Sequence, residues 1–127
     1  MYVDNPLLNI NVWTEEMLKL PDGKNEMFEA FKKDYNLTTP EQVRAYNGGP
    51  MQSVKEIAKG NYPILILCAD EDEAVSPAEN TNLFEKKIKA LGGEITVIHK
   101  PGFKHHPHSL PDPTPIVDFI IKAVNGK

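Results

Sequence analysis

Two short apolar runs dominate the hydrophobic pattern in the second half of the chain. Residues 64–68 are apolar at every position, and residues 95–98 form a second, shorter run. A strand that is buried on both faces has such an uninterrupted apolar sequence, without polar alternation. The two runs therefore predict two β-strands in a sheet that is covered on both sides.

A helical pattern lies between the two predicted strands. Ser76 is a suitable cap, Pro77 fits the first position, and Glu79 places an acid in the first turn. The apolar stripe of this helix consists of Leu83, Phe84, Ile88 and Leu91. Parallel neighbouring strands need a crossover of about a dozen residues or more, usually a helix. The pattern thus predicts a parallel β-α-β unit.

The last segment has the clearest helical periodicity of the chain. It begins after Asp112, with Pro113 in its first turn. Its apolar positions follow helical spacing and are Ile116, Phe119, Ile120, Ala123 and Val124. This amphipathic pattern predicts a helix with one face on the sheet.

The first 60 residues predict short helices rather than strands. Residues 1–13 contain many apolar side chains and no clear element. Four helices are expected at residues 14–20 with Thr14 as the cap, at 25–35, from Thr39 to about residue 47, and at 50–59. Each holds few large apolar residues. We therefore expect residues 1–60 to form a helical, cap-like segment and residues 61–127 to form the βαβα unit.

Composition and charge argue against nucleic-acid binding and against a membrane-spanning protein. The chain has 127 residues, 25% of them charged and 40% hydrophobic, which is typical of a globular domain. Its net charge is −4 without a basic cluster, so no nucleic-acid partner is expected. No apolar run approaches the roughly 18 residues of a membrane span, and no signal peptide is visible. As it stands, the sequence is expected to be cytoplasmic without a membrane partner.

An acid and an imidazole follow the two predicted strands. Asp72 lies in the loop after residues 64–68, and His105 lies in the loop after residues 95–98. The carboxyl ends of adjacent parallel strands meet at one edge of the sheet, where sites form. An acid can hold an imidazole in one tautomer, and the imidazole can take a proton from a nucleophile. Asp70 competes for the acid role, although a turn residue is the simpler interpretation of it.

The same segments resemble the C-terminal part of the α/β-hydrolase fold. The matching stretches are residues 63–67, 72–77 and 100–105, and the order acid then histidine is that of the family. The resemblance extends from about Tyr62 to Phe119 and is closest to bacterial carboxylester hydrolases, including those acting on acylated sugars. It implies that Asp72 and His105 are the catalytic acid and base. It also implies that residues 1–60 match the helical excursion after the sixth strand.

The nucleophile of that family is missing from this sequence. No Gly-x-Ser-x-Gly motif occurs, and Ser53, Ser76 and Ser109 are not flanked by the required glycines. The chain is therefore expected to be a C-terminal fragment or truncated product of a serine hydrolase, inactive alone. In the parent enzyme the resemblance implies a small acylated substrate, with acylated sugars among the candidates. The alternative is a non-catalytic α/β interaction module that self-associates.

The remaining histidines raise the question of a metal site. His106 and His108 could project together, because Pro107 favours an extended conformation at His106. No cysteine, helical histidine pair or carboxylate at ligand spacing accompanies them. A supporting role is the simpler prediction for both, and a structural role for His99. We therefore expect neither a metal ion nor a cofactor.

The strand at residues 64–68 also predicts self-association. In the resembled fold, its second edge pairs with a strand that would precede Met1. An unpaired apolar edge is a template for another chain, so a homodimer through this edge is expected. The rival prediction is that residues 7–12 cover the edge within the same chain.

Overall fold

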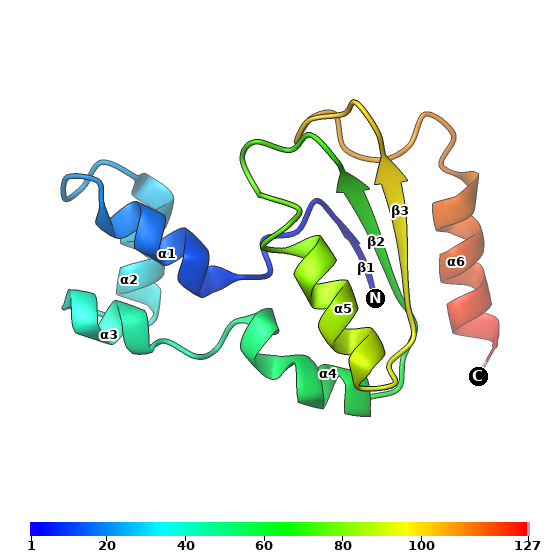
Figure 1. Cartoon of the computed structure of the whole chain (residues 1–127), viewed down its shortest axis with the longest axis horizontal. Coiled ribbons are helices and arrows are strands. Elements are labelled where there is room, and N and C mark those ends of the chain that lie inside the picture. The colour runs from blue at the N-terminus through cyan, green and yellow to red at the C-terminus, as the bar shows by residue number, and fades with distance from the viewer. Residues whose placement is uncertain (127) are drawn as a thin grey trace.

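A three-stranded parallel sheet runs through the centre of the fold (Figure 1). The computed structural model describes residues 1–126. The strands are β1 (Tyr2–Asp4), β2 (Ile64–Ala69) and β3 (Ile95–Lys100), in the spatial order β1-β2-β3. All six residues of β2 are buried, as its uninterrupted apolar sequence predicts. The chain therefore has an α/β fold with β2 at its centre.

The strand β1 is an addition to the two strands that the sequence predicts. Tyr2 pairs with Leu65 and Asp4 pairs with Leu67, in parallel register. Three residues with a terminal aspartate give almost no strand pattern, which is why the segment appeared irregular. The edge of β2 is thus covered by residues 2–4, and not by residues 7–12 as the rival prediction held. The unpaired edge from which a homodimer was expected is occupied within the chain, so that expectation loses its structural basis.

Helices surround the sheet and form the N-terminal part of the chain (Figure 1). They are α1 (Ile10–Leu18), α2 (Glu26–Asp34), α3 (Pro40–Ala45), a 3-10 turn η1 (Pro50–Ser53) that runs into α4 (Val54–Lys59), α5 (Thr81–Ala90) and α6 (Thr114–Asn125). Within residues 1–126, none of these helices has the length and apolar character to cross a membrane.

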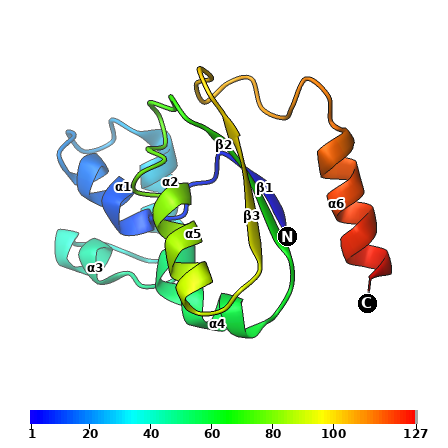
Figure 2. The ribbon, with the colours of Figure 1, turned by 45° about the vertical axis from the view of Figure 1, so that its right-hand side comes forward.

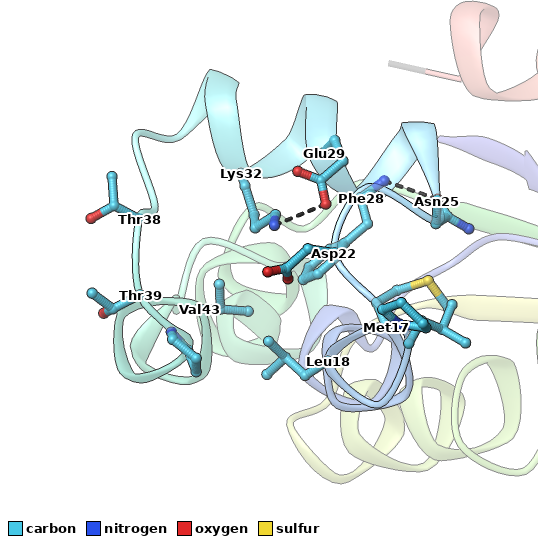
Figure 3. Close-up of a pocket in the computed structure, with 13 residues that line it drawn as sticks. Met17, Leu18, Asp22, Asn25, Phe28, Glu29, Lys32, Thr38, Thr39 and Val43 are labelled. Atoms are coloured by element: carbon cyan, nitrogen blue, oxygen red, sulfur yellow. Dashed lines mark hydrogen bonds and ion pairs between the residues drawn. The ribbon is translucent and has the colours of Figure 1, made fainter.

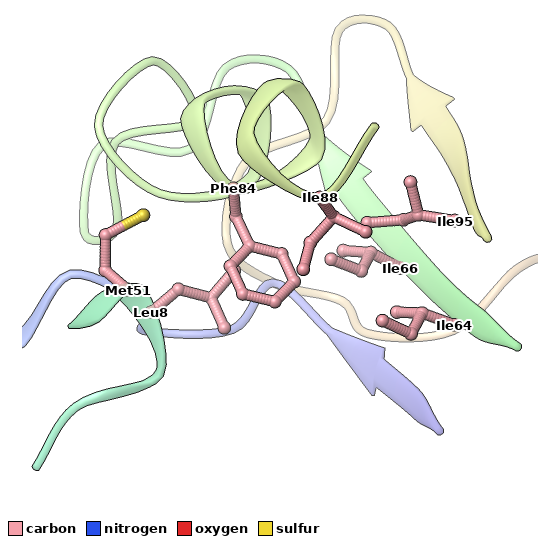
Figure 4. Packing of buried hydrophobic residues seen from close by; sticks show 7 residues of the cluster. All are labelled: Leu8, Met51, Ile64, Ile66, Phe84, Ile88 and Ile95. Atoms are coloured by element: carbon pink, nitrogen blue, oxygen red, sulfur yellow. The ribbon is translucent and has the colours of Figure 1, made fainter. Parts of the chain in front are cut away.

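Helices α4 and α5 cover one face of the sheet (Figures 1 and 4). Ile64 and Ile66 of β2 point toward this face and pack with Phe84 and Ile88 of α5, both fully buried. Leu8 and Met51 from the N-terminal part complete the cluster. The expected cap-like segment, residues 1–60, therefore shares a core with the expected βαβα unit.

Helix α6 covers the opposite face (Figure 2). Leu65 and Leu67 of β2 alternate away from α5 and pack against Ile116, with Phe119 partly buried beside them. The sheet therefore lies between two helical layers. This arrangement explains why β2 is apolar at every position.

Two helix starts differ from the predicted positions. α1 begins at Ile10, four residues before the predicted cap, and Thr14 is buried within it with its hydroxyl donating to the Asn11 carbonyl at 3.1 Å. α5 begins at Thr81, because Ser76 and Pro77 form a turn rather than the first helical turn. In contrast, the start of α3 is confirmed. Thr39 and Gln42 form a reciprocal capping box around Pro40.

Asn5 joins the end of β1 to both neighbouring segments. Its side-chain oxygen accepts from the Ala69 N–H at 2.8 Å, and its side-chain nitrogen donates to the His105 carbonyl at 3.0 Å. The residue is buried and has a left-handed backbone with φ 44°. Asparagine tolerates this conformation better than other side chains do. The Asn5 side chain thus gives the Ala69 N–H the hydrogen-bond acceptor that a longer β1 would have supplied.

We predict that Asn5→Ala lowers the free energy of unfolding by roughly 2–4 kcal/mol, because it leaves buried polar groups unpaired and because alanine tolerates left-handed backbone less well than asparagine does. Urea denaturation measures the change. Asn36→Ala is the matched control, since Asn36 is exposed and also left-handed with φ 56°. The control is expected to cost about 1 kcal/mol. Equal losses in the two variants would contradict the role assigned to the Asn5 side chain.

Candidate functional site: two loops at the carboxyl edge of the sheet

The loops that follow β2 and β3 lie side by side (Figure 1). Ala69 pairs with Lys100 at the last position of the two strands. Beyond this pair, the Asp70 N–H donates to the Lys100 carbonyl at 3.2 Å, and the Glu71 N–H donates to the Phe103 carbonyl at 3.0 Å. The backbone therefore holds the acidic loop against the histidine loop.

Asp72 is a buried carboxylate with a full set of partners. Its side chain is 2% exposed. Oδ1 accepts from the N–H groups of Ala74 and Val75 at 2.9 and 2.8 Å, which fixes the local turn. Oδ2 lies 2.7 Å from Nδ1 of His105. These two backbone bonds determine where Oδ2 points. The local sequence Asp-Glu-Ala-Val therefore orients the Asp72 carboxylate independently of its contact with His105.

His105 presents one ring nitrogen to Asp72 and leaves the other unused. The pairing through Nδ1 orients Nε2 away from the carboxylate, and the side chain is 27% exposed. Lys100 is buried and donates from Nζ to the Pro107 carbonyl at 2.9 Å, which anchors the loop two residues further on. The predicted juxtaposition of Asp72 and His105 is thus present in the structure. Their catalytic role stays a proposal.

A second aspartate–histidine pair lies on the same edge. Nδ1 of His99 is 2.6 Å from Oδ1 of Asp70, with 44% and 36% of the side chains exposed. The sequence analysis treated Asp70 as a turn residue and His99 as structural, and did not expect them to pair. Solvent screens an exposed pair strongly, so its two groups are weakly oriented. Burial distinguishes Asp72 from its competitor Asp70.

Three histidines gather at the outer end of the site. The rings of His105, His106 and His108 are mutually perpendicular, with centroids 4.7–5.1 Å apart. Nδ1 of His108 lies 3.3 Å from Oδ1 of Asp4, whose Oδ2 accepts from the Ser109 N–H at 2.5 Å. Sequence reasoning missed Asp4, because no strand was expected at residues 2–4 and nothing else places Asp4 at this edge.

Candidate nucleophiles do not accompany the Asp72–His105 pair. Within residues 1–126, no serine, threonine or cysteine side chain hydrogen-bonds the His105 ring. Ser53 donates instead to the Gly49 carbonyl at 3.2 Å. Cys68 is buried in β2, and the loss of hydration on burial raises the pKa of its thiol, which disfavours the nucleophilic thiolate. Within the described residues, the Asp72–His105 pair is therefore not hydrogen-bonded to any side-chain hydroxyl or thiol.

Two cavities of the described chain lie away from these loops. One, of about 410 Å³, is formed between α1, α2 and α3, where Met17, Phe28 and Val43 face the charged pair Glu29–Lys32 (Figure 3). The other, of about 380 Å³, separates Phe119 of α6 from the amino ends of β2 and β3. Neither is lined by residues of the two loops at the carboxyl edge.

Comparison with known proteins shows a distant fold relationship. No model of a known protein family matches the chain, and no curated protein matches it in sequence. Among solved structures, it is similar to a thermophilic esterase from the Planctomycetes species Thermogutta terrifontis, determined with propionate bound. The TM-score is 0.50, the identity is 16%, and the match covers 98% of this chain and 40% of that chain. The likeness extends to the fold alone, and the chain spans 40% of the length of the esterase.

We predict that His105 carries its neutral-state proton on Nδ1, because the hydrogen bond to the buried carboxylate contributes about 1.5–3 kcal/mol, a factor of roughly ten or more. Ring ¹⁵N chemical shifts at a pH where the ring is neutral report the tautomer. Asp72→Asn is expected to move the proton toward Nε2, since an amide nitrogen can donate to Nδ1. Asp70→Asn is the matched control and should leave His105 unchanged. A predominant Nε2–H tautomer in the unaltered protein would contradict the assignment.

Proposed function

We propose that this chain is the carboxyl-terminal part of a serine hydrolase that cleaves carboxylic esters, with Asp72 and His105 as its acid and base. The single observation that carries the proposal is the buried Asp72 carboxylate held 2.7 Å from Nδ1 of His105. The distant fold relationship to an esterase supports it. So does the order of the two residues, acid before histidine, which matches that of Ser…Asp/Glu…His enzymes.

The geometry of the pair supports the following proposed roles. Asp72 keeps the Nδ1–H tautomer and stabilises the imidazolium that forms during reaction. Nε2 of His105 then takes the proton of a serine hydroxyl and returns it to the leaving alcohol. The serine and the backbone donors for the oxyanion belong to a segment outside this sequence. The substrate class that fits the resemblance is a small acylated compound, with acylated sugars among the candidates.

The isolated 127-residue chain is predicted to show no saturable hydrolysis of p-nitrophenyl acetate, because acid and base alone have no nucleophile to activate. Joined to the coding sequence that precedes it in the genome, the protein is expected to hydrolyse the ester. In that longer protein, His105→Ala should lower kcat by about 10⁴-fold or more. His99→Ala is the control, as the equivalent change in the exposed pair.

Three results would overturn the proposal. The first is a preceding sequence without a Gly-x-Ser-x-Gly elbow. The second is a longer protein that stays active after His105→Ala. The third is hydrolysis by the isolated chain that is lost on Ser→Ala replacement at Ser53, Ser76 or Ser109.

A second candidate function is self-association, which we propose through α6 rather than through the edge of β2. Four aliphatic side chains at helical spacing face solvent on this helix: Val117, Ile120, Ile121 and Val124, between 44% and 70% exposed. They lie beside the stripe that packs on the sheet, so α6 is apolar on two faces. A second copy placing its own α6 on this stripe would bury both about a two-fold axis.

Sedimentation velocity at high micromolar concentration tests this second candidate. We expect a dimer that becomes monomeric on Ile121→Glu, because the charge would be buried against an apolar stripe. Met27→Glu is the control, since Met27 is 70% exposed on α2. A strict monomer, or a dimer unaffected by Ile121→Glu, would remove self-association through α6.

A further inference from the structure

We propose that His105, His106 and His108 form a binding site for a divalent first-row transition-metal ion, with Zn²⁺ as the reference ion. One ring nitrogen from each histidine lies within 4.8 Å of the others. Neutral imidazole suits zinc, copper and nickel, whereas Mg²⁺ and Ca²⁺ prefer oxygen ligands. The proposal can be tested independently of the hydrolase proposal, because the test measures binding of the metal alone.

Two of the three rings already have the partner that a metal-bound histidine needs. A ligating histidine almost always donates its other ring N–H to a carboxylate or carbonyl, which fixes the tautomer and makes the ligand more basic. Nδ1 of His105 is 2.7 Å from Asp72, and Nδ1 of His108 is 3.3 Å from Asp4. Both arrangements leave Nε2 as the ligand atom. The two carboxylates also lower the cost of bringing a cation to this edge.

The state of Asp4 is a second indication. Its Oδ1 is inaccessible to solvent and has no hydrogen-bond partner in the described chain, although it lies 3.3 Å from the His108 ring. A buried carboxylate oxygen without a donor is costly. If His108 binds a metal through Nε2, Nδ1 must carry the proton and face Asp4. Metal binding would therefore supply the missing donor.

The loop needs only a small adjustment to close around an ion. Zn–N bonds of about 2.0–2.1 Å in a tetrahedral site place neighbouring nitrogens about 3.4 Å apart. Contraction from 4.8 Å requires a shift of roughly 1 Å per ring. His106 and His108 are exposed, and His108 keeps its contact with Asp4, while Asp72 and the Asn5–His105 contact hold the third ligand. The fourth position is left to water.

The other cluster of metal-ligand type in the described chain fits less well. Cys68, Asp70 and His99 also bring three ligand atoms within 4.8 Å of one another. Zinc binds the thiolate, and burial of Cys68 in β2 disfavours that form by raising the pKa of the thiol. His99 meanwhile offers its Nδ1 to Asp70 itself. This cluster supplies the internal control for the test.

Isothermal titration of the metal-stripped, tag-free 127-residue protein with Zn²⁺ tests the site. One ion per chain is expected to bind, and Mg²⁺ is expected not to. His106→Gln and His108→Gln should each weaken binding by about tenfold or more, and His99→Gln should have no effect. Asp4→Asn and Asp72→Asn should weaken binding by about 10–100-fold, against no change for Asp70→Asn. His106 is exposed, so its variant is expected to keep the fold, which a thermal melt verifies.

The site is overturned if the unaltered protein binds Zn²⁺ no more tightly than about 1 mM, or if His106→Gln and His108→Gln leave the affinity unchanged. Loss of binding in His99→Gln would move the metal to the other cluster and would equally refute the proposal. Ring ¹⁵N shifts provide the structural readout. Zinc is expected at Nε2 of His105 and His108, and coordination through Nδ1 of either ring would contradict the arrangement.

Discussion

A single buried amide, that of Asn5, sets the relation between the sheet and both loops. Strand β1 ends at Asp4, so the Ala69 N–H at the end of β2 has no strand partner beyond that point. A buried backbone N–H must be paired, and Asn5 supplies the acceptor at 2.8 Å. The side-chain nitrogen of Asn5 donates to the His105 carbonyl. The position of the histidine therefore depends on the N-terminal residues, about a hundred positions earlier in the sequence.

A second buried asparagine, Asn80, also joins two distant segments through its side-chain amide. Its side-chain oxygen accepts from the N–H groups of Leu8 and Asn9 at 2.9 and 2.8 Å, and its nitrogen donates to the Ser76 carbonyl. Asn80 is buried and ends the loop that carries Asp72. Two asparagines thus attach the first nine residues to both ends of the site. The N-terminal segment belongs structurally to the sheet, although its sequence lacks any regular pattern.

This dependence on distant contacts separates what the sequence could predict from what it could not. Strands β2 and β3 and the cap at Thr39 can be predicted from local sequence, as composition or as spacing. The stripe expected on α6 is right only in part, because Ile116 and Phe119 pack on the sheet whereas Ile120 and Val124 face solvent. The Asp72–His105 pair follows from the register of two parallel strands. By contrast, β1 is a three-residue strand paired only with β2, and Thr14 lies inside α1 with its side chain buried, which its local sequence does not indicate. Asp4 and His108 lie near opposite ends of the sequence, so no local pattern indicates their contact.

The two aspartate–histidine pairs show why geometry alone does not define a site. Their Nδ1–carboxylate distances are 2.7 and 2.6 Å, yet the Asp72 side chain is 2% exposed and that of Asp70 is 36% exposed. Water screens an exposed pair and competes for its hydrogen bonds, whereas a carboxylate excluded from water interacts more strongly with the imidazole beside it. Only the buried pair is also fixed by a turn on one side and an amide on the other. The hydrolase proposal and the metal proposal both use Nε2 of His105. Because its one lone pair cannot accept a proton and bind a metal ion at the same time, the two proposed roles exclude each other at any one moment.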